Sequence, residues 1–132
     1  MSVESWDPKA ANSRLSDKEI DRFLAAADRL DEPGFGLAEN EVNDLAPLSR
    51  HGSADWAAAG VALGDAKVIA LIRLFTLAEA EFALWEAGAK SPVVPLAALL
   101  KKRGAYPDDL TAWIKARTSN RFLPYGSLLD RL

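Results

Sequence analysis

Few residues in this sequence could do chemistry, and those few stand apart from one another. The chain has no cysteine, which excludes thiol nucleophiles, thiolate metal sites and disulfides. Its single histidine, His51, stands beside Arg50, Gly52 and Ser53, where we expect a solvated loop side chain rather than a base or a metal ligand. There is no nucleophile-elbow serine, no phosphate-binding loop and no cluster of metal ligands. We therefore predict no catalytic residue, no cofactor and no metal.

Arg73 is the charged residue with the most unusual surroundings. On a helix, its neighbours three and four positions away are all uncharged. A buried arginine without a partner is costly. We expect Arg73 to pair with an acid from another part of the chain, such as Glu19, Asp21 or Glu41. The alternative is an anion-binding arginine in a cleft.

Two acids, Glu79 and Glu81, are surrounded by large apolar residues. Carboxylates two positions apart point in different directions on a helix, which makes them a poor catalytic or metal pair. We expect structural or simply exposed roles for both.

Charge is divided unevenly along the chain. Residues 1–89 hold 16 acids and 8 bases, a net charge of −8, whereas residues 90–132 hold 3 acids and 8 bases, a net charge of +5. The two parts either attract each other within one fold or present a basic face to an acidic partner or nucleic acid. DNA binding is disfavoured because Asp108 and Asp109 open the helix that would enter the groove.

Residues 118–126 combine polar, basic and aromatic types outside regular structure, as functional loops often do. We expect Phe122, Leu123 and Tyr125 to dock the C-terminal tail on the core, and the same segment could form the rim of a pocket. The candidate anion or partner contacts of the whole chain are Arg73, Lys102, Arg103, Arg117, Asn120, Arg121 and Tyr125.

A long helix over residues 66–87 is expected to position these side chains. Asp65 is a suitable N-cap, and Gly88 is a suitable residue to end the helix. The charges of this stretch do not gather on one side, which indicates a helix buried all round. A membrane span is the other interpretation, and the charges of Arg73, Glu79 and Glu81 near its middle argue against it.

Other helices are predicted on both sides of this one. Ser16 and Glu19 match a capping box that begins the first helix. Pro47 is expected to end or kink the second, and Gly60-x-x-x-Gly64 allows close approach of a neighbouring helix. The expected ranges are 17–30, 38–46, 54–63, 92–103 and 107–117, with a last turn at 128–132.

The sequence thus predicts an all-α fold, a single compact domain of five to six helices around helix 66–87. Residues 1–14 form an N-terminal arm; the domain covers 15–132, with a C-terminal helical hairpin (92–117) and a docked tail (118–132). Hydrophobic residues make up 49% and charged residues 27%, an ordinary globular composition. The N-terminus lacks an apolar signal region, so we expect the cytoplasm.

Three function classes remain open. The first is a non-enzymatic protein-interaction module, with a protein partner or a second copy of the chain as its partner. The second is a binder of nucleic acid or anionic ligands that uses the basic C-terminal half. The third is a small-molecule pocket protein with Arg73 in the pocket. No membrane partner is expected.

Overall fold

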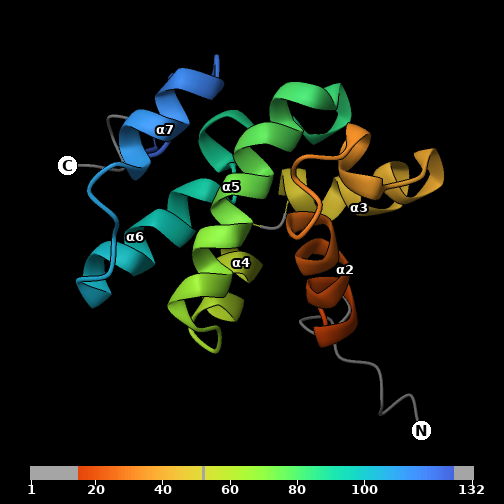
Figure 1. The fold of residues 1–132 in the computed structure, drawn as a ribbon. Helices are drawn as coiled ribbons and strands as arrows, with labels where there is room; N and C mark the ends of the chain where they lie inside the picture. Colours follow the sequence, from red (N-terminus) through yellow and green to blue (C-terminus); the bar gives the residue numbers. More distant parts are fainter. Residues whose placement is uncertain (1–14, 52, 127–132) are drawn as a thin grey trace, which may run out of the picture.

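The computed structural model describes residues 15–51 and 53–126, and within them the protein is all-helical, as predicted. Figure 1 shows α5 at the centre of the fold, with α2 and α3 on one side and α6 and α7 on the other. The predicted arm (1–14) and last turn (128–132) lie outside the described residues. The helices of the described ranges are α2 (Asp17–Ala27), α3 (Glu39–His51), α4 (Ser53–Gly60), α5 (Asp65–Glu81), α6 (Val93–Arg103) and α7 (Leu110–Arg117).

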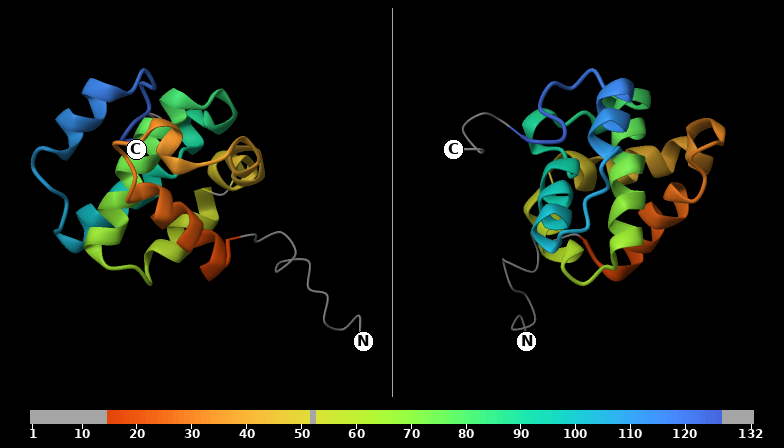
Figure 2. Two further views of the ribbon diagram at one scale, coloured as in Figure 1. Left: turned by 45° about the vertical axis from the view of Figure 1, so that its right-hand side comes forward. Right: turned by 60° about the vertical axis from the view of Figure 1, so that its left-hand side comes forward.

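The central helix α5 is buried on more than one side, as its scattered charges predicted. Leu71, Ile72, Leu74 and Phe75 are all inaccessible to solvent, although they point in different directions around the helix axis. Helices α2, α6 and α7 each pack against α5, and α4 packs against α6. The two views of Figure 2 show the same enclosure of α5 by the other helices. Helix α6 packs against α4 and α5 to the same extent, and α7 packs against α5 more than against α6.

An aromatic cluster fills the core where α2, α4 and α5 meet. The rings of Phe23, Trp56, Phe75 and Trp85 lie 5.0–6.2 Å apart, mostly in edge-to-face or tilted arrangements. Both indoles are satisfied: Trp56 Nε1 donates to the Leu48 carbonyl at 3.1 Å, and Trp85 Nε1 donates to the Val42 carbonyl at 2.9 Å. The cluster therefore fixes α3 to the chain that follows α5.

The central helix is shorter than predicted. It ends at Glu81, because Phe82 has an extended backbone (φ −112°, ψ 109°), and a 3-10 turn covers Ala83–Trp85. The chain turns back there, so that Trp85 enters the aromatic cluster and the Phe82 ring packs edge-on against Phe35 at 5.7 Å. Burial of these aromatic side chains outweighs the helical preference of the stretch.

The second helix is longer than predicted, because Pro47 lies inside α3 instead of ending it. Proline removes one backbone hydrogen bond to the carbonyl four positions earlier, here that of Asn43. Asn43 is exposed, so water can solvate this carbonyl. Leu45 and Leu48 on the same helix are buried, and their packing holds α3 together across the proline. His51 is the last residue of α3, whereas we expected it to lie in a loop.

The predicted signals at the helix ends have mixed outcomes. Ser16 caps α2 as predicted, because its hydroxyl oxygen accepts from the Glu19 backbone N–H. The Glu19 carboxylate accepts from the Ser16 hydroxyl, where the capping box predicted the Ser16 backbone N–H. Gly104 ends α6 in the left-handed conformation, with φ of 72°. Helix α2 ends at Ala27, about one turn earlier than expected.

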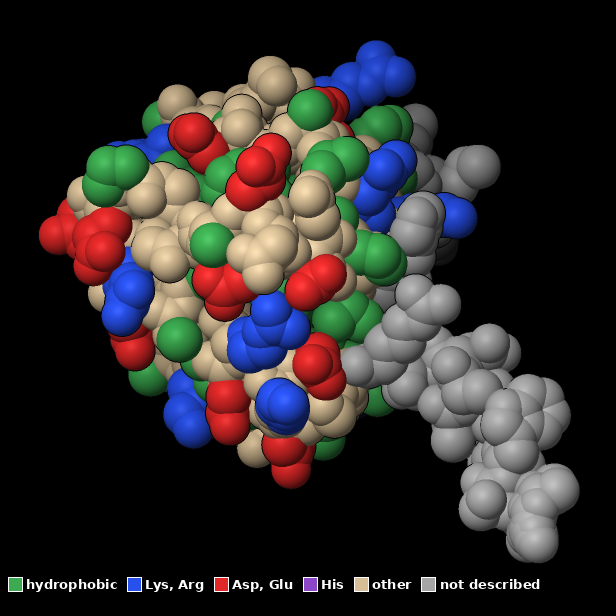
Figure 3. All heavy atoms as spheres, turned by 90° about the vertical axis from the view of Figure 1, so that its right-hand side faces the viewer, with side chains coloured by type: hydrophobic (Ala, Val, Ile, Leu, Met, Phe, Trp, Pro, Cys, Tyr) green, Lys and Arg blue, Asp and Glu red, His purple; other side chains and the backbone are tan. Residues whose placement is uncertain are grey.

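The surface on the side of α2 and α3 is mixed in charge. Figure 3 shows acidic and basic side chains interspersed there, with hydrophobic side chains in small separate areas. Within residues 15–51 and 53–126, the helices are too short or too polar to cross a membrane.

Candidate functional site

The residue with the most unusual environment is Glu79, in the last turn of α5. It is only 6% exposed to solvent. It lies four residues after Phe75 and seven after Ile72, on the buried stripe of the helix. Because α5 ends two residues later, the chain that returns over residues 82–91 closes around this carboxyl group. Glu81, which points in another direction, is exposed.

The two oxygens of the Glu79 carboxyl group differ in their partners. Oε2 accepts a hydrogen bond from the Ser91 hydroxyl, at the start of α6. Oε1 is buried and no donor among the described residues meets it in hydrogen-bond geometry, although the Asn120 side chain and the Ala87 backbone lie close enough to stabilise the carboxylate charge. A buried polar atom without a partner is uncommon in folded proteins and costs about 1–3 kcal/mol. Glu79 therefore presents an unused acceptor inside the protein.

Burial raises the pKa of Glu79 from 4.5 to about 7. The Ser91 and Asn120 side chains and the backbone of Ala87 act in the opposite direction, because they stabilise the charged form. The nearby negative charge of Glu86 adds a smaller increase to the pKa. At neutral pH, Glu79 can therefore either hold or release a proton.

Glu79 lies in the wall of a cavity of about 450 Å³. The cavity is formed by the end of α5, the returning chain and the segment that follows α7. It reaches the surface, because Ala80, Glu86, Ser119 and Arg121 in its wall are exposed. The complete wall consists of Glu79, Ala80, Glu86, Ala87, Gly88, Thr118, Ser119, Asn120, Arg121 and Phe122.

Asn120 holds the segment after α7 against the returning chain. Its side-chain nitrogen donates to the Gly88 carbonyl at 3.0 Å. Its side-chain oxygen accepts from the Phe122 backbone N–H at 3.0 Å, and its own N–H donates to the Thr118 hydroxyl at 3.0 Å. Asn120 was a predicted contact residue, and in the structure it builds one wall of the cavity.

The site offers a hydrogen-bond acceptor, a negative charge and a proton exchangeable near neutral pH, but no metal centre. Among the residues described, no three or more carboxylate or histidine side chains come together as a metal site would need. The arrangement can bind a hydrogen-bond donor or a cation, and it can exchange a proton with a bound molecule.

Arg73 does not form the acid pair that we expected. Of the ion pairs among residues 15–51 and 53–126, none includes Arg73, and its buried Nε atom has no hydrogen-bond partner. Its guanidinium lies 5.6 Å from the centre of the Trp113 ring instead. The expected acids are engaged elsewhere, since Glu19 and Glu41 both approach Arg22 at 3.9 Å. Arg73 therefore packs on an aromatic face, and it does not line the Glu79 cavity.

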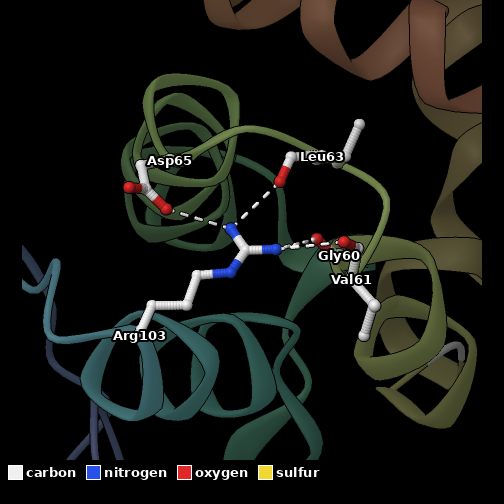
Figure 4. Close-up of polar contacts among 5 residues, drawn as sticks. All are labelled: Gly60, Val61, Leu63, Asp65 and Arg103. Atoms are coloured by element: carbon white, nitrogen blue, oxygen red, sulfur yellow. Dashed lines mark hydrogen bonds and ion pairs between the residues drawn. The ribbon is translucent and has the colours of Figure 1, made fainter.

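Arg103 forms hydrogen bonds and an ion pair with other parts of the same chain. Its guanidinium donates to the carbonyls of Gly60 and Val61 at 3.1 Å and to that of Leu63 at 3.0 Å. It also pairs with Asp65 at 3.0 Å. Figure 4 shows this arginine reaching from α6 to the loop between α4 and α5. Its neighbour Lys102 is exposed.

The other predicted contact residues lie near aromatic rings. Arg117 lies 4.4 Å from the centre of the Trp113 ring, the same ring that Arg73 contacts. Arg121 lies 5.4 Å from the Phe122 ring at the cavity wall. The Tyr125 ring has Lys101 at 4.1 Å and Lys115 at 5.6 Å. The structure thus brings Asn120 and Arg121 to the cavity and leaves Arg73, Lys102, Arg103, Arg117 and Tyr125 outside its wall.

Sequence reasoning missed Glu79 and Ser91 as site residues. The signal for Glu79 was its spacing from Ile72 and Phe75, which places it on the apolar stripe, whereas Glu81 falls off that stripe. No sequence signal linked Ser91 to Glu79, because that contact depends on where the helix ends. Comparison of the chain with models of protein families, with curated proteins and with solved structures found no match in any of the three.

Proposed function

We propose that the protein binds a small polar molecule in the cavity beside Glu79. The observation that carries the proposal is the buried Oε1 atom of Glu79, which lacks a hydrogen-bond partner in a residue that lines an open cavity. A ligand that donates a hydrogen bond to this atom would remove the cost of its burial.

The dimensions and lining of the cavity support this proposal. Its volume of about 450 Å³ lies in the range of small-molecule sites. Its wall combines apolar surface from Ala80 and Phe122 with polar groups of Glu79, Asn120 and Arg121. A carboxyl group with a shifted pKa in such a cavity is a common feature of binding sites. The proposal corresponds to the third function class predicted from the sequence, a small-molecule pocket protein, with Glu79 in the role given to Arg73.

The other two function classes have less support. Among the described residues, the large apolar side chains that are exposed are Val61, Leu84 and Tyr125, which come from different parts of the chain. A protein interface normally needs a continuous patch. For nucleic acid, Asp108 and Asp109 still precede α7, and Lys115 and Arg117 lie at its far end. A cytoplasmic location and a protein or self partner stay predictions from the sequence.

A fragment screen read by backbone amide NMR tests the proposal. Small polar fragments should shift the amide signals of Gly88 and Asn120. Ala80→Phe places a ring at the cavity wall and should abolish these shifts. Ala83→Phe is the matched control, because Ala83 is also exposed but lies outside the wall. Shifts that persist in Ala80→Phe, or that gather elsewhere on the molecule, would contradict the proposal.

A further inference from the structure

The Glu79 carboxylate lacks one kind of close partner, a cation. The ion pairs formed within the described ranges do not include Glu79, so no lysine or arginine there neutralises its charge at close range. The last turn of α5, which contains Glu79, carries no basic residue. Oε2 accepts a hydrogen bond from the neutral Ser91 hydroxyl, and the other two groups that stabilise the carboxylate, the Asn120 side chain and the Ala87 backbone, are neutral as well. An ionised Glu79 is therefore a buried charge without a counter-ion, an arrangement that strongly favours a bound cation.

The polar groups of the wall are mostly used within the protein. The Asn120 side chain bonds to Gly88 and Phe122, its backbone N–H bonds to Thr118, and the Ser91 hydroxyl bonds to Glu79. The atom left without a partner is an acceptor, Glu79 Oε1. A ligand must therefore bring a donor to it, and a hydrogen bond between a charged donor and a carboxylate is the strongest that this atom can make.

The electrostatic surroundings favour a positively charged donor. Glu79 lies at the C-terminal end of the 17-residue helix α5, where the backbone carbonyls make the local potential negative. Glu86 adds a second negative charge from the returning chain. Arg121 is the opposing charge in the wall, and it is exposed, with its guanidinium near the Phe122 ring. Ser91 lies just before α6, and the first turn of α6 contains no charged side chain.

An organic cation fits these observations better than a metal ion. A bare metal ion would need three or more protein ligands, and such a group is not found in the parts of the chain described. A cavity of about 450 Å³ has room for an organic group attached to the charge. Alanine and phenylalanine side chains in the wall provide apolar contact for that group.

We propose that the ligand carries a primary ammonium group, which donates a hydrogen bond to Glu79 Oε1 and neutralises the Glu79 carboxylate, with Glu86 at the mouth of the cavity. This inference rests on the proposed function, and it names the chemical class of the ligand. The same ammonium chemistry belongs to free small amines and to lysine side chains of peptides. The volume of the cavity, about 450 Å³, admits either source.

Calorimetric titration at pH 8 tests the assignment. Propylammonium should bind at least about tenfold more tightly than 1-propanol, since a buried charge pair is worth more than about 1.4 kcal/mol. Glu79→Gln should abolish this preference, whereas Glu81→Gln, an exposed acid on the same helix, should leave it unchanged. Nα-acetyl-lysine-N-methylamide represents a lysine side chain of a peptide. If it binds more tightly than propylammonium, the ligand is a peptide; if it binds more weakly, the ligand is a free amine.

The pH dependence gives a second readout. Because Glu79 has a pKa of about 7, its ionised fraction falls about tenfold between pH 8 and pH 6. Propylammonium affinity should fall by a similar factor, and binding at pH 6 should release a proton, measured as a heat that differs between buffers of different ionisation enthalpy. An affinity that does not change between these pH values would contradict the pairing with Glu79.

The outcomes separate the inference from the proposed function. If 1-propanol binds as tightly as propylammonium, and Ala80→Phe still blocks binding, the ammonium assignment is wrong and the site stands. If no fragment or amine binds, both are wrong. Glu86→Gln leaves the core untouched, and should weaken propylammonium about threefold, as expected for an exposed charge. This variant keeps the test decisive if Glu79→Gln does not fold by circular dichroism.

Discussion

At the scale of single residues, burial decides how the two carboxylates near the end of α5 behave. Glu79 and Glu81 have the same chemistry and lie two positions apart, but only Glu79 faces the interior. Desolvation penalises the charged form of a buried acid, whereas an exposed acid keeps its hydration. The helix geometry therefore produces one buried carboxyl group with a raised pKa and one exposed surface acid within a single helical turn.

Replacing Glu79 by glutamine should change how stability depends on pH. Because the pKa of Glu79 is raised from 4.5 to about 7, the folded state keeps a proton in this interval that the unfolded state has lost. The contribution of Glu79 to the free energy of unfolding therefore falls as pH rises from about 4.5 to 7, by roughly 3 kcal/mol in all. Glu79→Gln removes this contribution. We therefore expect the free energy of unfolding of Glu79→Gln, measured relative to that of the wild type, to increase between pH 5 and pH 8.

Urea denaturation at pH 5, 6, 7 and 8 measures this effect. The glutamine can still accept the Ser91 hydrogen bond, so a small difference from wild type is expected at pH 5. Glu81→Gln is the control, and its stability should follow the wild-type pH dependence. Parallel curves for wild type and Glu79→Gln would show that Glu79 is not the group responsible.

At the scale of helices, a single glycine sets how closely α4 and α6 approach. A Cβ atom at Gly60 would lie 2.9 Å from Leu99 Cδ2 and 3.1 Å from Leu96 Cδ2, whereas one at Gly64 would meet nothing within 4 Å. The glycine spacing in the sequence predicted close packing of a neighbouring helix, and the structure confirms it for Gly60 alone. Gly64 instead serves as the N-cap of α5.

Gly60→Ala should therefore lower the free energy of unfolding by about 1 kcal/mol, because the added methyl group must displace two leucine side chains. The gain in helix propensity is small there, since Gly60 is the last residue of α4. Gly64→Ala is the comparison without a steric contact, and should cost only about 0.5 kcal/mol, because alanine is a poorer N-cap residue than glycine. Chemical denaturation of the two variants side by side would reveal the difference, and equal losses would contradict the close packing.

The helices were predicted better than the places where they end. The capping box at Ser16 and the glycine at 104 gave correct boundaries, because both act through local backbone hydrogen bonds. The ends of α3 and α5 were wrong, because tertiary packing decides them: Leu45 and Leu48 carry α3 across Pro47, and Trp85 leaves the helix to join the core. The Glu79 cavity depends on that early end of α5, so the sequence alone could not reveal it.

At the scale of the whole molecule, the acidic part of the chain (1–89) and its basic part (90–132) are not joined by a network of ion pairs within the described residues. Among residues 15–51 and 53–126, one ion pair joins the acidic and basic parts of the chain, that of Arg103 with Asp65. Several other bases lie over aromatic rings, as Lys101 does over Tyr106 at 5.0 Å. The basic part is therefore held to the body by apolar packing and by hydrogen bonds to carbonyl groups.

Arg103 is the clearest case, because one side chain connects α6 to the end of α4 and the start of α5 (Figure 4). A lysine cannot donate to several carbonyls in the same fork geometry. We expect Arg103→Lys to lower the free energy of unfolding by about 1 kcal/mol, and the melting temperature by about 4 °C. Lys102→Ala, at the exposed neighbouring position, should have little effect.

Salt distinguishes the contacts that Arg103 makes. The pair with Asp65 is screened at 1 M NaCl, because Asp65 is half exposed, with 51% of its side chain accessible. The three contacts with the carbonyls of Gly60, Val61 and Leu63 involve no second full charge and are screened less. Most of the loss in Arg103→Lys should therefore persist when melting is measured at 1 M instead of 0.1 M NaCl. If the loss disappears at high salt, the Asp65 pair is the contact that joins the two parts of the chain, and the carbonyl contacts add little.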